Sequence, residues 1–341
     1  MRIAIVGAGA MGCLLGHGLC RSGNEVSLID LPARVADLRA NRELTVIGPE
    51  GLQSSVTPAQ ITSDYSKAGI HELVVLATKA HDLPAVADCI AGLVNEQSSI
   101  MTIQNGIPWW YLHGFQDEFG TARINCLDPD GLLEQNIAPV QIVGCVAYPA
   151  AIVEPDGRIR HVEGLRLPVG ECDNLPRERT HMIAQVLNES GFKSRVIEDI
   201  RSEIWLKAWG ALTINPVSAL TRTTMEEICT FPGTHELIAQ MMHEAQQVAE
   251  ALGAKFRHTI EERIQGARRV GQHKTSMLQD LENGQPLELD ALMLAVLELA
   301  QLTGKKTPTI QTVYACAALL NENLRAVHNR AGAVADSTFR N

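Results

Sequence analysis

A run of small residues near the N-terminus is the strongest chemical signal in the sequence. It occupies six consecutive positions, Gly7, Ala8, Gly9, Ala10, Met11 and Gly12. An apolar stretch of strand length precedes it and an apolar helix-forming stretch follows it. In this setting the glycines permit a tight turn, let a pyrophosphate reach the backbone and let the helix pack on the strand. The helix N-terminus also attracts phosphates. The six residues therefore predict a dinucleotide-binding turn; a plain glycine-rich βα turn is the structural alternative.

Asp30 stands at the end of the second predicted strand, residues 25–30, and lies 18 positions after Gly12. A carboxylate at this place accepts hydrogen bonds from the adenosine ribose hydroxyls and repels a 2′-phosphate, which favours NADH over NADPH. Two alternatives remain open. Asp30 could simply begin the turn before Pro32, and the nearby guanidinium of Arg34 could still hold a phosphate.

Two later strand ends also carry polar side chains. Residues 71–77 and 98–104 predict buried strands of a parallel sheet, and they lead into Lys79 and Asn105. Ligands gather at the carboxyl ends of such strands, so Lys79 is a candidate for holding the cofactor or a substrate anion, and Asn105 for lying beside the nicotinamide. A solvated loop lysine and an ordinary Asn-Gly turn are the structural alternatives.

The segment 200–215 predicts a helix on which Lys207 and Asn215 share one face. Lys207 lies between two tryptophans, and burial there would lower its pKa because the charged amine loses hydration. Such a lysine is suited to general acid catalysis near neutrality. Alternatively its stem covers apolar surface while the ammonium stays in water. Pro216 should end the helix and turn Asn215 away from helical geometry.

Two further stretches carry groups that could bind a small acid. Ser276 lies in a polar segment, 273–280, whose hydroxyls could hold a carboxylate or a hydroxyl. Pro286 suits the first position of a helix, which would make Glu288 a first-turn acid. Favourable interaction with the helix dipole alone would explain such an acid, so chemistry by itself makes Glu288 structural.

The elements that must position these residues fall into two parts. Strands and helices alternate up to about residue 198, and helical periodicity dominates after it. The sequence thus predicts an α/β dinucleotide-binding domain of residues 1–197 followed by an all-helical domain of residues 198–330. Further predicted elements of the first part are a strand pair within 44–59, strands at 141–147, 158–162 and 194–198, and a helix at 180–187.

Length and composition narrow the class of protein. A chain of 341 residues is longer than a single hydrophobic core usually accommodates, which suggests two domains. The net charge of −10 argues against a nucleic-acid partner. No apolar run reaches the roughly 20 residues that span a bilayer, and no signal sequence precedes the first strand, so we expect a cytoplasmic protein. The eight cysteines lack any C-x-x-C pair, which predicts buried thiols in a reducing compartment and no metal site.

Six motifs occur in order along the chain and at suitable separations. They are GAGAMG at 7–12, Thr78-Lys79, Gln104-Asn105-Gly106, a tryptophan–lysine segment that ends in Asn215-Pro216, Ser276–Asp280, and Glu288-Leu289-Asp290. Together they resemble the ketopantoate reductase family over residues 1–325. The resemblance implies a Rossmann domain, an all-helical C-terminal domain and an active site in the cleft between them. It also implies reduction of 2-dehydropantoate to (R)-pantoate with NADPH.

The resemblance assigns roles to residues that chemistry alone leaves open. Lys207 is similar to the family's catalytic lysine, which protonates the carbonyl oxygen as the hydride arrives. The other matched positions imply a cofactor-side lysine at Lys79, contact with the nicotinamide ribose and substrate at Asn105, substrate ligands at Asn215 and Ser276, and contact with the cofactor ribose at Glu288.

Three positions depart from the family pattern. Ala211 stands where the family has an asparagine one turn after the lysine, and residues 222–225 lack a further substrate-side asparagine. Asp30-Leu31 replaces the arginine expected to hold a 2′-phosphate. Fold and reaction type survive these changes, whereas the substrate and the choice between NADH and NADPH stay open.

Three functional hypotheses follow. The first is NAD(P)H-dependent reduction of 2-dehydropantoate, or a related small 2-oxo acid, to the (R)-2-hydroxy acid. The second is an NAD-dependent D-2-hydroxy acid dehydrogenase with a bulkier apolar substrate, because Ala211 leaves more apolar room. The third is a dinucleotide sensor without turnover, which a buried lysine counts against. The apolar segment 287–302 could line a homodimer interface or only a core.

Overall fold

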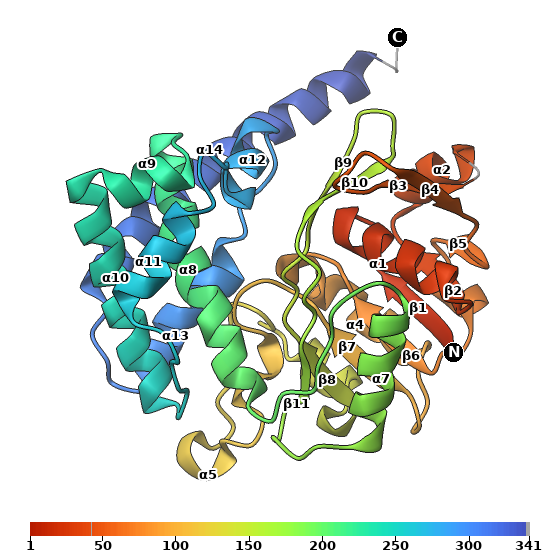
Figure 1. The fold of residues 1–341 in the computed structure, drawn as a ribbon, viewed down its shortest axis with the longest axis horizontal. Helices are drawn as coiled ribbons and strands as arrows, with labels where there is room; N and C mark the ends of the chain where they lie inside the picture. Colours follow the sequence, from red (N-terminus) through yellow and green to blue (C-terminus); the bar gives the residue numbers. More distant parts are fainter. Residues whose placement is uncertain (42, 339–341) are drawn as a thin grey trace. The chain divides into compact units, whose positions relative to one another are not determined.

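The computed structural model describes the chain from residue 1 to 338 except residue 42, with side chains described through residue 326 (Figure 1). The chain divides into two compact units, Met1–Glu203 and Ile204–Asn341. The first unit contains all the strands, and the second is helical.

A seven-stranded sheet forms the centre of the first unit, in the order β11-β8-β7-β6-β1-β2-β5. Neighbouring strands of this sheet run parallel, except that β11 pairs antiparallel with β8. Its inner strands are buried along almost their whole length, as a sheet covered on both faces requires. This strand order is that of a doubly wound Rossmann sheet, so the predicted fold class is confirmed. The strands are β1 (Arg2–Val6), β2 (Glu25–Ile29), β5 (Gln60–Thr62), β6 (Leu73–Leu76), β7 (Ser99–Thr102), β8 (Ile142–Cys145) and β11 (Val169–Glu171).

Among the described residues of this unit, seven α-helices accompany the sheet, and α1 is the one that matters most for the site. Its residues from Gly12 to Leu19 are buried. It packs against β1 and β2 and also against the strands of a second sheet. The helices are α1 (Ala10–Arg21), α2 (Pro32–Ala40), α3 (Tyr65–Ala68), α4 (Ala87–Ala91), α5 (Gln116–Phe119), α6 (Leu132–Asn136) and α7 (Glu178–Glu189).

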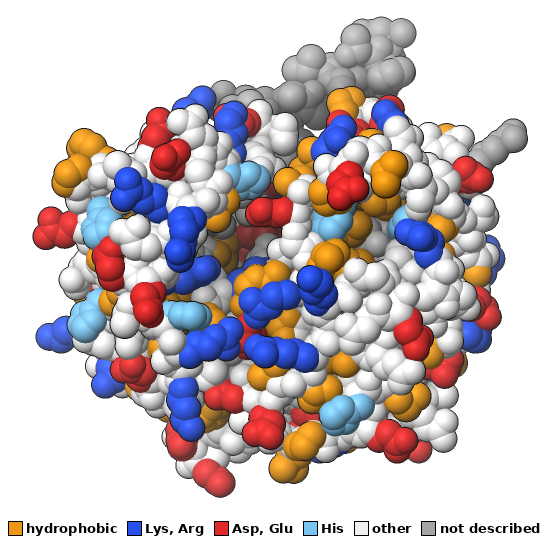
Figure 2. Space-filling view, in the orientation of Figure 1, with side chains coloured by type: hydrophobic (Ala, Val, Ile, Leu, Met, Phe, Trp, Pro, Cys, Tyr) orange, Lys and Arg blue, Asp and Glu red, His pale blue; other side chains and the backbone are white. Residues whose placement is uncertain are grey.

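The second sheet has four strands in the order β4-β3-β10-β9. They are β3 (Leu44–Ile47), β4 (Gln53–Val56), β9 (Ala150–Val153) and β10 (Ile159–Glu163). The predicted strand pair and the strand after the Gly157 turn are both present, but the sequence did not indicate that they join one sheet. Ile152 and Val153 of the edge strand β9 are exposed. Hydrophobic side chains reach the surface over the β9–β10 hairpin in Figure 2.

The strand predicted at 194–198 does not form. Only isolated bridges occur there, Arg166 with Lys193 and Val169 with Val196. The backbone N–H of Ser194 donates to the side chain of Asn188 at 2.9 Å, so it is not available to a strand ladder. The prediction was wrong because a local side-chain contact replaces continuous pairing.

The helical unit is a set of short and long helices with well-defined ends. Thr224 and Thr259 each form a capping box with a glutamate three residues later. Buried Glu244 accepts hydrogen bonds from the Thr309 and Ile310 N–H groups and so closes the start of α14. The elements are α8 (Ile200–Thr221), α9 (Met225–Thr230), α10 (Pro232–Ala251), α11 (Ile260–Arg268), α12 (Ser276–Glu282), the π-helical segment η5 (Asp290–Leu294), α13 (Ala295–Leu302) and α14 (Pro308–Thr338).

Two predicted helix boundaries in this region are wrong. Helix α8 continues through Pro216 to Thr221, because the turn beyond the proline is buried and its packing offsets the lost hydrogen bond. The helix predicted from Pro286 instead begins after Glu288, because the Leu287 N–H donates to Asn321 of α14 at 2.8 Å. Glu288 therefore precedes the helix and is not a first-turn acid.

The cysteines only partly follow their prediction. Four of them are buried, but Cys89 and Cys316 are exposed, so the expectation that all are buried was wrong. The residues described here contain no cluster of three histidine, cysteine or acidic side chains that could hold a metal ion. Within the same residues, no helix has the length and apolar character needed to cross a membrane.

Candidate functional site

The glycine turn between β1 and α1 has the geometry its residue types predict. Gly7 has φ +100°, and a Cβ added there would lie 2.5 Å from the Thr78 backbone nitrogen. A Cβ at Gly12 would lie 1.9 Å from the Gly7 carbonyl oxygen. Both positions thus exclude any side chain, Gly7 by its backbone conformation and contacts, Gly12 by close packing of helix on turn.

Gly9 is different, because a Cβ there would meet nothing within 4 Å. Gly9 is the N-cap of α1, with no side-chain cap and no acidic residue in the first turn. The first N–H groups of the helix thus adjoin open space, in the field of the positive end of the helix dipole. This is the cradle that a pyrophosphate fits, and a side chain at position 9 would intrude into it.

Asp30 and Arg34 contact the same turn from the end of β2. One Asp30 carboxylate oxygen accepts from the Ala8 N–H at 2.5 Å and the other from the Leu31 N–H at 2.6 Å. Each oxygen keeps a further lone pair for a ligand hydroxyl. Arg34 donates through Nε to the Ala8 carbonyl at 2.9 Å. A carboxylate and a guanidinium therefore both lie beside the glycine turn, where the adenosine ribose of a dinucleotide binds in this fold.

The ends of β6 and β7 are joined by Gln104. Its side-chain Nε2 donates to the carbonyls of Leu76, at 2.8 Å, and Thr78, at 3.3 Å. Lys79 and Asn105, each half-buried, follow directly on these two segments. The Gln104 Oε1 and Thr78 Oγ1 atoms are buried without a hydrogen-bond partner. Unpartnered polar atoms at the carboxyl ends of parallel strands are what a polar ligand would satisfy.

The groups described so far fit a nicotinamide dinucleotide. They are the open space at Gly9, the carboxylate at the end of β2 and the unpartnered atoms at the ends of β6 and β7. All of them belong to the first unit.

The remaining predicted residues belong to the second unit. Lys207 and Asn215 are half-buried on α8, and Ala211 lies between them on the same face. The flanking Trp205 and Trp209 are fully buried, so the stem of Lys207 starts from an apolar part of the helix.

Ser276 lies at the start of α12, and Glu288 lies after the end of that helix. Ser276 is the exposed first residue of that helix, and Thr275 caps it by accepting from the Leu278 N–H at 3.2 Å. Glu288 is half-buried in the segment that Asn321 holds through the Leu287 N–H. Both residues therefore stand on short segments fixed by neighbouring side chains.

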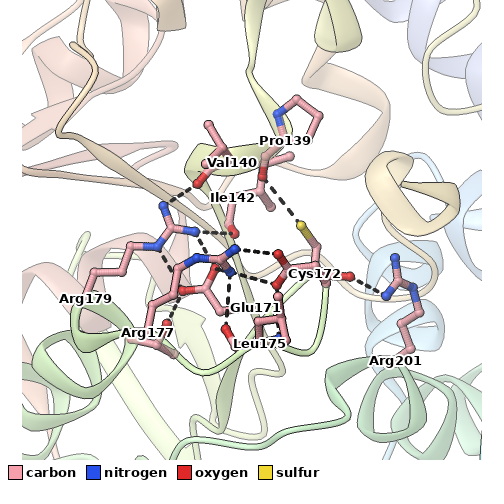
Figure 3. A network of polar contacts seen from close by, with 11 residues as sticks. Pro139, Val140, Ile142, Glu171, Cys172, Leu175, Arg177, Arg179 and Arg201 are labelled. Carbon is pink, nitrogen blue, oxygen red and sulfur yellow. Dashed lines mark hydrogen bonds and ion pairs between the residues drawn. The ribbon is translucent and has the colours of Figure 1, made fainter. Parts of the chain in front are cut away.

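Figure 3 shows a network that the sequence did not reveal. Glu171, at the end of β11, is 2% exposed and accepts hydrogen bonds from Arg177, Arg179 and Thr180. Arg201, in the first turn of α8, donates to the carbonyls of Tyr111, Cys172 and His113. These contacts tie α7 and the start of α8 to the edge of the sheet.

Sequence reasoning missed these residues for different reasons. Gln104 belongs to a recognised motif, yet only its neighbour Asn105 received a role. A glutamine just before a strand-end Asn-Gly could have drawn attention, since its amide can bond main chain on the next strand. Glu171 and Arg201 lie in ordinary-looking segments, and no local pattern marks them as buried.

The two halves of the chain match two family models. The model described as "Ketopantoate reductase PanE/ApbA" matches residues 3–174, and "Ketopantoate reductase PanE/ApbA C terminal" matches residues 199–321. The chain therefore belongs to the ketopantoate reductase family, as the six motifs indicated.

Individual relatives agree. A protein from Mesorhizobium japonicum named 2-dehydropantoate 2-reductase is 44% identical over 92% of this chain and 96% of its own. A crystal structure of a ketopantoate reductase homologue from Ralstonia solanacearum MolK2 is 32% identical and matches with a TM-score of 0.88, covering 94% of this chain and 98% of the other. A D-mandelate dehydrogenase solved with NADH and anilino(oxo)acetate has the same fold at 23% identity, with a TM-score of 0.81 over 95% of this chain and 99% of that one.

Family membership defines the kind of enzyme. The chain is an oxidoreductase of the ketopantoate reductase type that uses NAD(P)H and acts on a small molecule.

Proposed function

We propose that the enzyme reduces 2-dehydropantoate, or a closely related 2-oxo acid, to the (R)-2-hydroxy acid. The 44% identity to a 2-dehydropantoate 2-reductase over nearly the whole chain carries this proposal. Residues 1–197 hold the dinucleotide, and residues 198–330 supply substrate and catalytic groups. A cytoplasmic location and a homodimer remain predictions; a dimeric ketopantoate reductase from Staphylococcus aureus shares the fold at 21% identity.

The chemistry requires a proton for the carbonyl oxygen while the bound nicotinamide supplies a hydride to the carbonyl carbon. Lys207 is the residue we assign to the proton, because its ammonium rises from a buried apolar stretch of α8. Before the proton leaves, the same charge stabilises the developing alkoxide. Asn215 and Ser276 bind the substrate, and Asn105 orients the substrate and the nicotinamide ribose.

The cofactor is held by the residues of the glycine turn, Gly7, Ala8, Gly9, Ala10, Met11 and Gly12, together with Asp30, Lys79, Asn105 and Glu288. The main chain from Gly9 onward receives the pyrophosphate, and Lys79 adds a positive charge.

We further propose that NADH binds more tightly than NADPH. A 2′-phosphate beside Asp30 would meet a carboxylate that is held in place by the Ala8 and Leu31 N–H groups. Arg34 works in the opposite direction, but one of its N–H groups already donates to the Ala8 carbonyl. Like-charge repulsion at hydrogen-bonding distance should outweigh a partly engaged guanidinium.

Dissociation constants of both reduced cofactors test this preference. Wild type should favour NADH, so its dissociation constant for NADPH should exceed that for NADH. Asp30→Asn keeps the shape and removes the charge, and it should lower this ratio of NADPH to NADH dissociation constants about three- to tenfold. Arg34→Gln is the matched variant, and it should change the ratio less than Asp30→Asn does. A wild-type preference for NADPH that Arg34→Gln abolishes would show that the guanidinium holds the phosphate and that the proposal is wrong.

Ala211 favours one alternative, an NAD-dependent D-2-hydroxy acid dehydrogenase with a bulkier apolar substrate. Alanine cannot hydrogen-bond a second substrate hydroxyl and leaves apolar room on the face of Lys207 and Asn215. The fold does not choose between the two activities, because a D-mandelate dehydrogenase shares it.

A panel of 2-oxo acids, measured as kcat/KM with each reduced cofactor, separates the hypotheses. The proposed function requires 2-dehydropantoate to be the best substrate. The alternative requires an aromatic or branched 2-oxo acid such as benzoylformate to exceed it. Ala211→Asn should shift the ratio toward 2-dehydropantoate in either case. If neither reduced cofactor were oxidised in the presence of any of these acids, the dinucleotide sensor without turnover would be the remaining hypothesis.

A further inference from the structure

A cavity lies in the first unit, on the side of α1 that faces the four-stranded sheet. Its volume is about 260 Å³. One face of α1 lines it with Leu14, His17, Gly18 and Arg21, and the opposite wall comes from the β3–β4 turn, from His161 of β10 and from residues 190–192. None of the residues assigned to the dinucleotide is among its lining. We call it the α1 cavity.

Two buried histidines, His17 and His161, line this cavity. His17 is 5% exposed, and its Nε2 lies 3.0 Å from the Ser54 carbonyl oxygen. His161 is 8% exposed, and its Nε2 lies 2.6 Å from the Gly164 carbonyl oxygen. A carbonyl oxygen only accepts, so the His161 Nε2 must carry a proton and donate. The His17 Nε2 also lies 2.7 Å from the Ser54 hydroxyl, so it either donates to the carbonyl or accepts from that hydroxyl.

Because Nε2 is engaged in both rings, Nδ1 is the remaining nitrogen of each. Neither Nδ1 has a hydrogen-bond partner in the part of the chain that the structure describes. Neither belongs to the polar atoms that are buried from solvent without a partner. In an imidazolium ring both nitrogens carry a proton, so Nδ1 is then a donor. Both rings can therefore offer a positively charged N–H to an anion.

The charge of the cavity has one sign. Arg21, in the last turn of α1, is exposed and forms no ion pair with any described acidic side chain. No aspartate or glutamate is among the described residues that line the cavity, whereas Ser54 and Ser190 add hydroxyls. Figure 2 shows histidine, basic and also acidic side chains at the surface over α1 and the β9–β10 hairpin, so the single sign holds for the cavity lining only.

We propose that the α1 cavity binds a small molecule carrying a carboxylate or phosphate group. Arg21 at the mouth supplies a permanent charge, and the Nδ1 atoms of His17 and His161 supply donors when the rings are protonated. The volume lies just below the range of about 300–1,000 Å³ typical of drug-sized ligands, so the occupant is small.

Binding should strengthen as the pH falls. Burial lowers the pKa of His17 below its ordinary value of 6.5, with a smaller contribution from Arg21. The empty cavity thus holds His17 neutral near pH 7, and an anion raises its pKa by favouring the imidazolium. Proton uptake therefore accompanies binding, which makes the complex tighter below neutrality. The other charged or titratable groups that line the cavity are Arg21, one turn further along α1, and His161, on the opposite wall.

The test uses the full chain with saturating NAD⁺, so that the glycine turn does not contribute. Inorganic phosphate and malonate are titrated separately at pH 6 and pH 8, with histidine side-chain NMR and calorimetry as readouts. We expect at least one anion to shift the His17 and His161 resonances and to bind more tightly at pH 6. The phosphate and malonate arms distinguish the two anion types.

Three variants decide whether the binding belongs to this cavity. Arg21→Gln, an exposed position that should leave folding intact, and His161→Gln should each weaken binding about tenfold, the loss of one charged hydrogen bond. His181→Gln, an exposed histidine of α7 outside the cavity, should change nothing. Absence of a histidine shift with either anion would overturn the proposal, and so would equal binding by wild type and Arg21→Gln.

Discussion

The glycine turn of the first unit and helix α8 of the second build their candidate sites from different parts of the chain. The turn uses main-chain N–H groups, and its side chains matter mainly through their absence at positions 7, 9 and 12. Helix α8 offers the side chains of Lys207 and Asn215. Whether they can contact a substrate depends on the direction in which that face of the helix points. The turn has no room for a Cβ at Gly7 or Gly12, whereas the helix tolerates many substitutions as long as its few polar side chains remain.

The largest effect should come from the side-chain site. Lys207→Ala removes the proposed proton donor and should lower kcat by about 10²–10⁴-fold, with the dissociation constant of NADH unchanged. Steady-state kinetics and cofactor titration measure the two quantities separately. Lys306→Ala, an exposed lysine of the same unit, is the control. An unchanged kcat in the Lys207 variant would contradict the assignment.

The main-chain site allows a matched pair of glycine variants. Gly9→Ala places a methyl group in open space, so folding should survive while dinucleotide affinity falls roughly 10–100-fold, or about 1.4–2.8 kcal/mol. Gly12→Ala forces a Cβ within 1.9 Å of the Gly7 carbonyl oxygen and should lower the free energy of unfolding by about 1–3 kcal/mol or more.

Urea unfolding and NADH titration of both variants separate a steric effect on the ligand from one on the fold. If Gly9→Ala bound NADH as well as wild type does, the open space at Gly9 would not be the pyrophosphate cradle. If Gly12→Ala were as stable as wild type, the turn would have to shift without cost.

The same contrast explains what the sequence could predict. Strands β1, β2, β6, β7 and β8 and the glycine turn follow from apolar runs and from the steric demands of glycine, which are local. The second sheet, the course of α8 through Pro216 and the late start of the helix after Glu288 depend on packing or on a distant partner such as Asn321. Local pattern contains no information about such partners, and the errors fall there.

Gln104 combines both kinds of site, since its side chain holds main chain in place. Gln104→Leu removes the side-chain donor of the Leu76 and Thr78 carbonyls, and Leu76 keeps only the longer bond from the Ile103 N–H at 3.3 Å. We expect the free energy of unfolding to fall by about 1–3 kcal/mol. The KM for the reduced cofactor should rise about tenfold, because Lys79 and Asn105 follow the loosened segments. Gln97→Leu, an exposed glutamine ahead of β7, is the control. A loss of stability with no change in KM would make Gln104 purely structural.

The smallest effect concerns pH and is confined to the first unit. Burial, with a further contribution from Arg201, lowers the pKa of His113 from 6.5 to about 4. Its Nδ1 is buried without a partner, and Glu134, the nearest acid, lies 3.8 Å from its Nε2. Between pH 6.5 and pH 4 the unfolded chain binds a proton that the folded chain does not, so stability falls as the pH falls.

His113→Gln removes the group that binds this proton in the unfolded chain, so the free energy of unfolding should depend less on pH in the variant. Between pH 7 and pH 5 wild type should lose about 1–2 kcal/mol more than the variant does. Urea unfolding at the two pH values measures the difference, with the exposed His181→Gln as the matched control. Amide exchange at a single acidic pH locates it, since the variant should be better protected than wild type in residues 1–203 and equally protected in the helices beyond. If the variant were better protected than wild type in those helices as well, the two units would not respond to acid separately.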